Sequence, residues 1–195
     1  MAVNERLTGP WARRPDVRVG AVVAVAIAIA FVVWLLVRGG DSNNAANPGT
    51  ATGQAAGPEA TSADKLRALS VELGHPIYWA GAVPDRTYEL TRTSDNRIFV
   101  RYLPKGVPVG IRQAAFTIVG TYPVDDAYKV LKGLAKKAGE SEFSAPVGGF
   151  AVYSTAQPSN VYLAYPGSNV QIEVYDPSPQ RARRLITSGQ VAAVS

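Results

Sequence analysis

The sequence predicts an α+β domain with a mainly antiparallel sheet, preceded by one transmembrane helix. An uncharged run of 19 residues occupies positions 19–37. Short runs rich in β-branched and aromatic residues, separated by turn residues, dominate the rest and are typical of hairpins. Amphipathic stretches with helix-capping signals lie between them. From residue 63 onward we therefore expect about six or seven strands and three helices.

The apolar run, VGAVVAVAIAIAFVVWLLV, is long enough to cross a bilayer. As a helix it extends roughly 28 Å, close to the thickness of the hydrocarbon core. A cleaved signal peptide would have a shorter apolar core that ends in a small-x-small site, but the candidate Ala28-Ile29-Ala30 lies inside the run. We therefore expect an uncleaved signal anchor that meets the lipid bilayer from Val19 to Val37.

Charge on the two sides of this run predicts its orientation. Residues 1–18 carry four arginines, whereas Arg38 is the only basic residue between the run and Lys65. Cytoplasmic flanks carry the excess of positive charge, so we expect 1–18 to be the cytoplasmic tail of a single-pass protein of the cell membrane. Residues 38–62 lack large apolar side chains, which predicts a flexible tether. The extracytoplasmic domain is then 63–195.

Local signals place the first helix and strand of this domain. Ser62 is a suitable N-cap for a helix over 63–73, and Gly74 can adopt the left-handed conformation that ends a helix. The His75-Pro76 pair that follows disfavours helix, so a short strand is expected over 77–79.

The middle of the domain reads as a hairpin, a strand and a helix. Two β-rich runs, 87–93 and 97–103, flank Ser94-Asp95-Asn96, residues that favour turns. Another strand is expected over 114–122. A helix follows over 123–138, with aspartates near its start and lysines near its end, as the helix dipole prefers.

Three further strands and a closing helix are expected at 149–154, 160–166, 170–177 and 179–189. In the last strand, apolar residues alternate with Gln171, Glu173 and Tyr175, which predicts one face packed on helices and the other partly wetted. Asn96 and Asn169 each precede a tyrosine by six residues, and each tyrosine precedes a proline by two. We consider an internal duplication of a helix-plus-three-strand unit, with a chance match between two hairpins as the alternative.

Composition argues against several classes of function. The formal net charge is +5, and the domain from residue 63, with 15 basic and 11 acidic residues, has a balance of +4. This charge is mild and does not predict nucleic-acid binding. The chain has no cysteine, so disulfides and thiolate metal sites are excluded. The sequence contains no glycine-rich phosphate loop and no serine nucleophile elbow, and no cofactor is expected.

Reactive side chains are isolated in the sequence. His75 is the only histidine and has neither a second metal ligand nor a catalytic partner near it, so a structural role is expected. The acids of the first hairpin form no recognised catalytic dyad. Surface ion pairs are expected there, with Glu89 opposite Arg101 or Arg97.

Two groups of residues are weak candidates for a binding surface. Tyr78 and Trp79 could form an aromatic platform for a sugar or a peptide, although aromatic residues in strands more often pack in a core. The exposed side of the 123–138 helix could contact anionic lipid headgroups rather than water alone. Its basic residues are Lys129, Lys132, Lys136 and Lys137. The arginines of the closing helix, Arg181, Arg183 and Arg184, would extend this patch.

A resemblance is carried by the segments HPIYWAG, YELTRT, RIFVRYLPKGVPVG, VGTYPVDDAY and QIEVYDPSPQRARRLITSG. On these segments the chain resembles uncharacterised single-pass membrane proteins of high-GC Gram-positive (actinobacterial) bacteria. The resemblance covers the domain and not the tether. It implies the same location, and it implies no activity, substrate or catalytic residue.

We therefore expect a membrane-tethered, non-enzymatic domain that binds or scaffolds another envelope component, such as an envelope protein or a wall polymer. The alternative is a receptor-like module that binds a small ligand or a cell-wall fragment on the wetted face of the sheet. An enzyme built from carboxylates that the sequence alone cannot pair is the least favoured hypothesis. A cleft lined by two facing acids would favour the enzyme.

Overall fold

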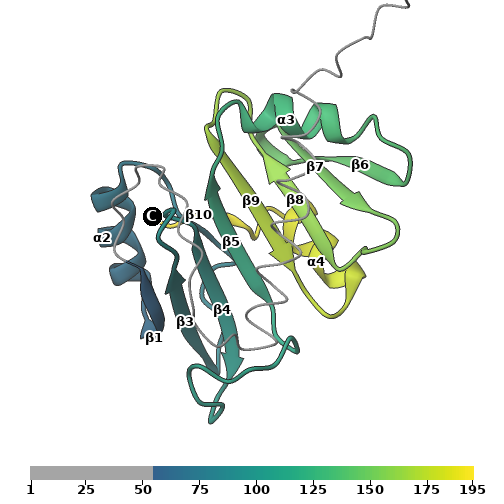
Figure 1. The fold of residues 1–195 in the computed structure, drawn as a ribbon. Helices are drawn as coiled ribbons and strands as arrows, with labels where there is room; N and C mark the ends of the chain where they lie inside the picture. Colours follow the sequence, from purple (N-terminus) through teal and green to yellow (C-terminus); the bar gives the residue numbers. More distant parts are fainter. Residues whose placement is uncertain (1–54) are drawn as a thin grey trace, which may run out of the picture.

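Eight antiparallel strands form one sheet in residues 55–195, the part of the chain that the computed structural model describes. The strands are β1 (Ala56–Thr61), β3 (Arg86–Arg92), β4 (Ile98–Pro104), β5 (Ile118–Pro123), β6 (Glu140–Ala145), β7 (Gly149–Ser154), β8 (Asn160–Ala164) and β9 (Val170–Tyr175). Their order across the sheet is β1-β3-β4-β5-β9-β8-β7-β6 (Figure 1). A second, two-stranded sheet pairs β2 (Tyr78–Trp79) with β10 (Ala192–Ala193).

Within residues 55–195, three α-helices complete these elements: α2 (Ala63–Leu73), α3 (Ala127–Leu134) and α4 (Pro179–Thr187). The α+β class, the antiparallel sheet and the number of helices are therefore confirmed. The predicted tail, the predicted span and most of the predicted tether lie outside the described residues. Within 55–195, none of the helices combines the length and the apolar character that a bilayer crossing needs.

The predicted number of strands, six or seven, is too low, because the sequence pattern indicates neither the edge strands β1 and β6 nor the short strand β10. β1 falls inside the predicted tether 38–62, so the predicted domain boundary at residue 63 is wrong. An edge strand is held mainly by backbone hydrogen bonds to one neighbour and needs little apolar surface. The side chains from Ala56 to Ala60 are all exposed while the backbone pairs with β3. β6 has the same character, with Phe143 its only large apolar residue.

The capping signals of the first helix are confirmed. The Ser62 Oγ accepts a hydrogen bond from the Lys65 N–H at 3.3 Å, and Gly74 takes the left-handed conformation with φ of 68°. The helix buries Leu66 completely against the sheet. The predicted hairpin is also present as β3 and β4, and Asn96 in its turn adopts φ of 59°.

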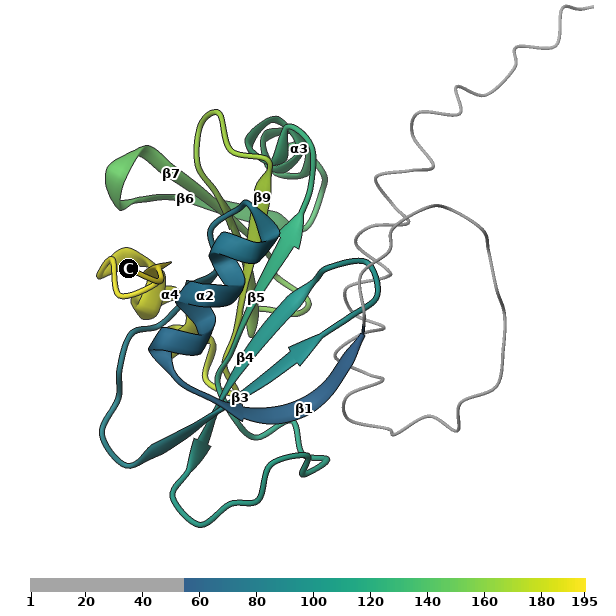
Figure 2. The ribbon, with the colours of Figure 1, turned by 90° about the vertical axis from the view of Figure 1, so that its left-hand side faces the viewer.

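The two faces of the sheet carry separate cores, because successive side chains of a strand point to opposite sides. On the face that we call the α4 face, Val100, Ala151 and Ile172 join a large cluster with residues of α2 and α4. On the opposite α3 face, Phe150 and Val152 pack with residues of α3. Figure 2 shows α2 and α4 on the same side of β5. Helices therefore cover both faces of the second half of the sheet.

The prediction of a partly wetted face on the last strand is wrong for Gln171 and Glu173, whereas Tyr175 at the strand end is partly exposed. Gln171 and Glu173 are only 2% and 3% exposed. β9 lies between β5 and β8 in the middle of the sheet, so polar residues on its α3 face are enclosed by neighbouring side chains. Alternation of polar and apolar residues here reflects a buried polar cluster rather than contact with water.

The helix predicted over 123–138 is shorter than expected. Pro123 is the last residue of β5, and Asp126, with φ of 52°, precedes the first helical residue. Ala127 and Leu131 are buried, whereas Ala138 is exposed beyond the helix end. The helix thus presents two turns to the sheet.

The strand order bears on the repeat noted in the sequence. Asn96 precedes β4 and Asn169 precedes β9, so the sequence match aligns these two strands. β4 is one strand away from the centre of the sheet, whereas β9 is at the centre beside β5. The matched strands therefore do not occupy equivalent places in the sheet.

Candidate functional site

The two aromatic candidates are engaged in packing. The Tyr78 ring stacks on Tyr165 with centroids 5.9 Å apart, and the Trp79 ring meets Tyr88 edge to face at 5.7 Å. Both side chains are half-buried against the core of the α4 face. Burial raises the pKa of the Tyr78 hydroxyl above its ordinary value. Tyr78 and Trp79 therefore pack against the core, which is the alternative to a binding role, and the two rings do not form a flat aromatic platform.

The four lysine candidates are exposed on α3 or just beyond its end. Lys132 is less free than the others, because its Nζ lies 3.7 Å from the centroid of the Phe150 ring. The predicted extension of this patch to the arginines of α4 is wrong, since α3 and α4 pack on opposite faces of the sheet. A contact between the lysines and anionic lipid stays a prediction.

His75 is held by local contacts. Its carbonyl accepts a hydrogen bond from the Ser70 hydroxyl at 2.8 Å, and its Nδ1 lies 3.1 Å from the Pro76 carbonyl oxygen. Its Nε2 is buried and has no hydrogen-bond partner within residues 55–195. In the same part of the chain, no group of three histidine, aspartate or glutamate residues is arranged to hold a metal ion.

The predicted ion pair of Glu89 forms with Arg101 at 2.8 Å, but it is buried rather than at the surface. Their side chains are 4% and 8% exposed. Glu89 also accepts the Gly110 N–H at 2.6 Å. A buried pair needs such additional hydrogen bonds to offset the loss of hydration. The pair therefore anchors the loop between β4 and β5, which contributes to the cleft described next.

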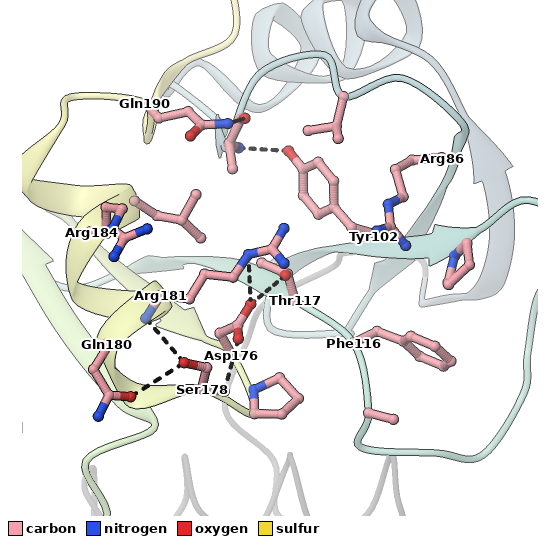
Figure 3. A pocket seen from close by; sticks show the side chains of 16 residues that line it. Arg86, Tyr102, Phe116, Thr117, Asp176, Ser178, Gln180, Arg181, Arg184 and Gln190 are labelled. Carbon is pink, nitrogen blue, oxygen red and sulfur yellow. Dashed lines mark hydrogen bonds and ion pairs between the residues drawn. The ribbon is translucent and has the colours of Figure 1, made fainter.

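A cleft of about 780 Å³ lies between the end of β4, the loop before β5 and the start of α4 (Figure 3). Its apolar wall includes Val83, Phe116 and Leu185. Three arginines and one aspartate supply its formal charges: Arg86, Arg181, Arg184 and Asp176. The cleft is the candidate functional site, because a concave surface with a few converging polar groups is the usual form of a ligand site.

Asp176 is committed to holding the cleft together. It is 4% exposed and accepts hydrogen bonds from the Thr117 hydroxyl at 2.6 Å and from the Ser178 N–H at 2.9 Å. The Arg181 Nε lies 3.5 Å from the same carboxylate. These contacts join the loop before β5 to the first turn of α4, so the carboxylate has little capacity left for a ligand.

Tyr102, on the other wall of the cleft, is also engaged in hydrogen bonds within the protein. Its hydroxyl accepts the Ala80 N–H at 2.6 Å and donates to the Gly81 carbonyl at 3.3 Å. Burial raises the pKa of this hydroxyl well above its ordinary value. The group is therefore neutral at physiological pH and is occupied by backbone partners.

The arginines differ from these groups because they have unused donors. Within the described part of the chain, Arg86 and Arg184 form no ion pair with a carboxylate, and Arg181 engages Asp176 only through Nε. Figure 3 shows Arg184 on the α4 side and Arg86 on the opposite side, near Tyr102. Guanidinium groups stay charged and bind carboxylates and phosphates through two parallel hydrogen bonds. The cleft is therefore suited to an anion.

Sequence reasoning did not identify this cleft. The sequence predicts a surface patch for Arg181 and Arg184, and it gives no local signal for Arg86 or Asp176. The lining residues come from four separate segments that the sheet and α4 bring together. Ser178 caps the N-terminus of α4 beside the site, but a capping residue marks the end of a helix and not a binding site.

Comparisons of the chain with models of protein families, with curated proteins and with solved structures find no match. Asp176 and Tyr102 are already hydrogen-bonded within the protein and are therefore poorly suited to proton transfer, whereas the guanidinium groups that are unpaired within the described residues can bind an anion.

Proposed function

We propose that the chain is a membrane-tethered, non-enzymatic binding module of the cell envelope, and that it holds an anionic component in the arginine-lined cleft. One observation carries the proposal. Arg86 and Arg184 have no ion-pair partner within residues 55–195, whereas the only carboxylate in the cleft is already hydrogen-bonded. A site with free cations and no free acid attracts anions and disfavours amines and metal ions.

The same residues support binding rather than catalysis. General acid–base catalysis needs a titratable group that can reach the reacting atom and exchange a proton near the working pH. In this cleft the Asp176 carboxylate accepts two hydrogen bonds and forms an ion pair with Arg181, and the Tyr102 hydroxyl bonds two backbone groups. An arginine does not release its proton at such pH values. This distribution also lacks the two facing acids that the enzyme hypothesis required.

The cleft favours the receptor-like alternative over scaffolding through a flat surface. A volume of about 780 Å³ lies within the range of sites that hold small molecules or short polymer segments. A wall fragment or a charged envelope polymer fits this description. The site differs from the one expected, because it lies beside α4 and not on a wetted face of the sheet.

The location of the module is part of the proposal. The uncharged run 19–37 and the excess of arginine before it support an uncleaved anchor with its N-terminus in the cytoplasm. The resemblance to single-pass membrane proteins of high-GC Gram-positive bacteria points in the same direction. A domain held outside the membrane would meet anionic polymers and headgroups rather than nucleic acid.

An internal duplication is the remaining part of the proposal. Strands β3, β4 and β5 precede α3, and strands β7, β8 and β9 precede α4. The two sets lie in opposite order on either side of the β5–β9 pair, with β1 and β6 at the outer edges. This arrangement supports a repeated unit of four strands and a helix, and not the helix-plus-three-strand unit expected from the sequence.

Site-specific crosslinking in cells tests the proposed function. A photoreactive amino acid would replace Ala115, which is exposed and lines the cleft, in the full chain. Val71, 79% exposed on α2, is the control position. We expect an anionic envelope component to be captured from position 115 and not from position 71, and Arg184→Gln to reduce that capture. Equal capture from both positions, or capture indifferent to Arg184, would contradict the proposal.

A further inference from the structure

We propose that the ligand of this cleft carries two anionic groups separated by a short uncharged body, with one group bound by Arg86 and the other by Arg184. The inference rests on the proposed function, because it specifies what the same cleft binds. It follows from three observations: the balance of charge in the cleft, the placement of the two free arginines, and the apolar part of the lining.

The charge balance favours a ligand with two negative charges. Arg86, Arg181 and Arg184 are positive, and Asp176 is the only negative side chain in the lining. The contact between Arg181 and Asp176 pairs one positive charge with the negative one. Arg86 and Arg184 remain, so a ligand that neutralises the cleft supplies two charges. A single charge would leave one guanidinium without a partner.

The placement of the arginines favours two separate anionic groups. Arg86 is the first residue of β3 and is paired with Pro104 across the sheet, whereas Arg184 lies in α4. In Figure 3 their side chains lie on opposite sides of the cleft. Each guanidinium fork matches one carboxylate or phosphate. Two forks on different walls therefore select two groups held apart, rather than one compact anion.

The apolar part of the cleft lining fits an uncharged body. Phe116, Val83 and Leu185 give the cleft an apolar wall. Gln190 donates its Nε2–H to the Ala80 carbonyl at 3.0 Å, which leaves its amide oxygen as an acceptor. This oxygen can accept a hydrogen bond from a ligand hydroxyl group, and it repels a third anionic group. The structure thus selects a dianion with an apolar or hydroxylated linker.

Two classes of compound carry two anionic groups on a short linker: dicarboxylates and compounds with two phosphate groups. Isothermal titration calorimetry with the full 195-residue chain in a non-ionic detergent separates them. One arm compares glutarate with its monomethyl ester. The other arm compares propane-1,3-diyl bisphosphate with propyl phosphate, which has one phosphate group and the same carbon chain. Both arms are run at neutral pH and low ionic strength, where exposed charge pairs are screened least.

In at least one arm, we expect the compound with two groups to bind about tenfold or more tightly than its single-group partner, because linking two anions makes the second contact intramolecular. Arg86→Gln and Arg184→Gln should each remove this advantage. Arg183→Gln is the matched control from the same helix, because the Arg183 guanidinium lies 5.0 Å from the Tyr153 ring and does not line the cleft. The arm that shows the advantage identifies the anionic group.

The outcomes distinguish this inference from the proposed function. Arginine-dependent binding of single-group and two-group compounds with equal affinity would overturn the inference and leave the anion-binding function in place. Failure of all four compounds to bind in an arginine-dependent manner would overturn both. If a glutamine variant does not fold, as judged by its thermal melt, Arg184→Lys replaces it. Lysine keeps the charge and loses the fork, so the advantage should decrease without the loss of all binding.

Discussion

The buried carboxyl of Glu173 should make the stability of the domain depend on pH. Glu173 is 3% exposed on the α3 face of β9 and accepts hydrogen bonds from the Tyr122 hydroxyl and the Asn160 side-chain amide. Burial raises the pKa of this carboxyl from 4.5 to about 7, against the opposing effects of those two hydrogen bonds and of the Arg97 charge. We predict that Glu173→Gln removes this pH dependence.

The direction in which stability changes with pH follows from the direction of the Glu173 pKa shift. A carboxyl with a raised pKa in the folded state stabilises the fold most below its unfolded pKa, and this stabilisation is lost as pH rises through the folded pKa. The relevant window is therefore from 4.5 to about 7. One pKa unit corresponds to about 1.4 kcal/mol, so the free energy of unfolding decreases by about 3 kcal/mol as pH rises across the window. Glutamine has no proton to lose, so its variant lacks this term.

Urea unfolding of the parent and of Glu173→Gln at a series of pH values measures the effect. The difference in unfolding free energy should move in favour of the variant by up to about 3 kcal/mol as pH rises through the window. Other acids titrate equally in both proteins and cancel. Glu142→Gln, at an exposed position of β6, is the control and should show no such trend. A difference that is constant with pH, or that moves in favour of the parent, would refute the reasoning.

Three further measurements address the packing, the boundary and the location of the domain. Because Trp79 is only half-buried against Tyr88, Trp79→Ala should cost about 2 kcal/mol, less than the truncation of a fully buried tryptophan, whereas His75→Ala should cost at most about 1 kcal/mol; thermal melts measure both. Equal losses would contradict the structural roles given to both residues. A fragment of residues 63–195 lacks β1 and exposes the edge of β3, so it should aggregate more readily than residues 55–195 in light scattering. Equal solubility would show that β1 is dispensable. A reporter that is active only outside the cytoplasm should work when fused after Ser195, and activity of only a cytoplasmic reporter there would contradict the proposed orientation.

Strong local signals explain which parts of the fold could be predicted. Ser62 and Gly74 mark the ends of α2, and the turn at Asn96 joins two strands with clear alternation. β1 and β6 lack that alternation, because backbone pairing at a sheet edge asks little of the side chains. Their assignment depends on the neighbours β3 and β7, which local sequence patterns do not specify.

The candidate site could not be predicted for a related reason. Arg86 and Arg184 are separated by most of the domain in sequence, and only the packing of α4 brings them to one cleft. Arg183 and Arg184 are neighbours in the chain, yet one lies over Tyr153 and the other lines the cleft. Similarly, Glu173 has the sequence context of a solvent-facing position, and its burial results from the central place of β9.

The pairing of β10 with β2 has a consequence for the order in which the domain can fold. The Val194 N–H donates to the Ile77 carbonyl at 2.8 Å, and the Gln190 side chain reaches the Ala80 carbonyl across 110 positions of the chain. Synthesis proceeds from the N-terminus, so residues 77–80 cannot form these hydrogen bonds until Gln190 and Val194 have been synthesised. The two-stranded sheet of β2 and β10 therefore cannot form while the chain is still being translated through residue 189. Final closure is a late event, and factors that shield unfinished strands would act throughout that delay.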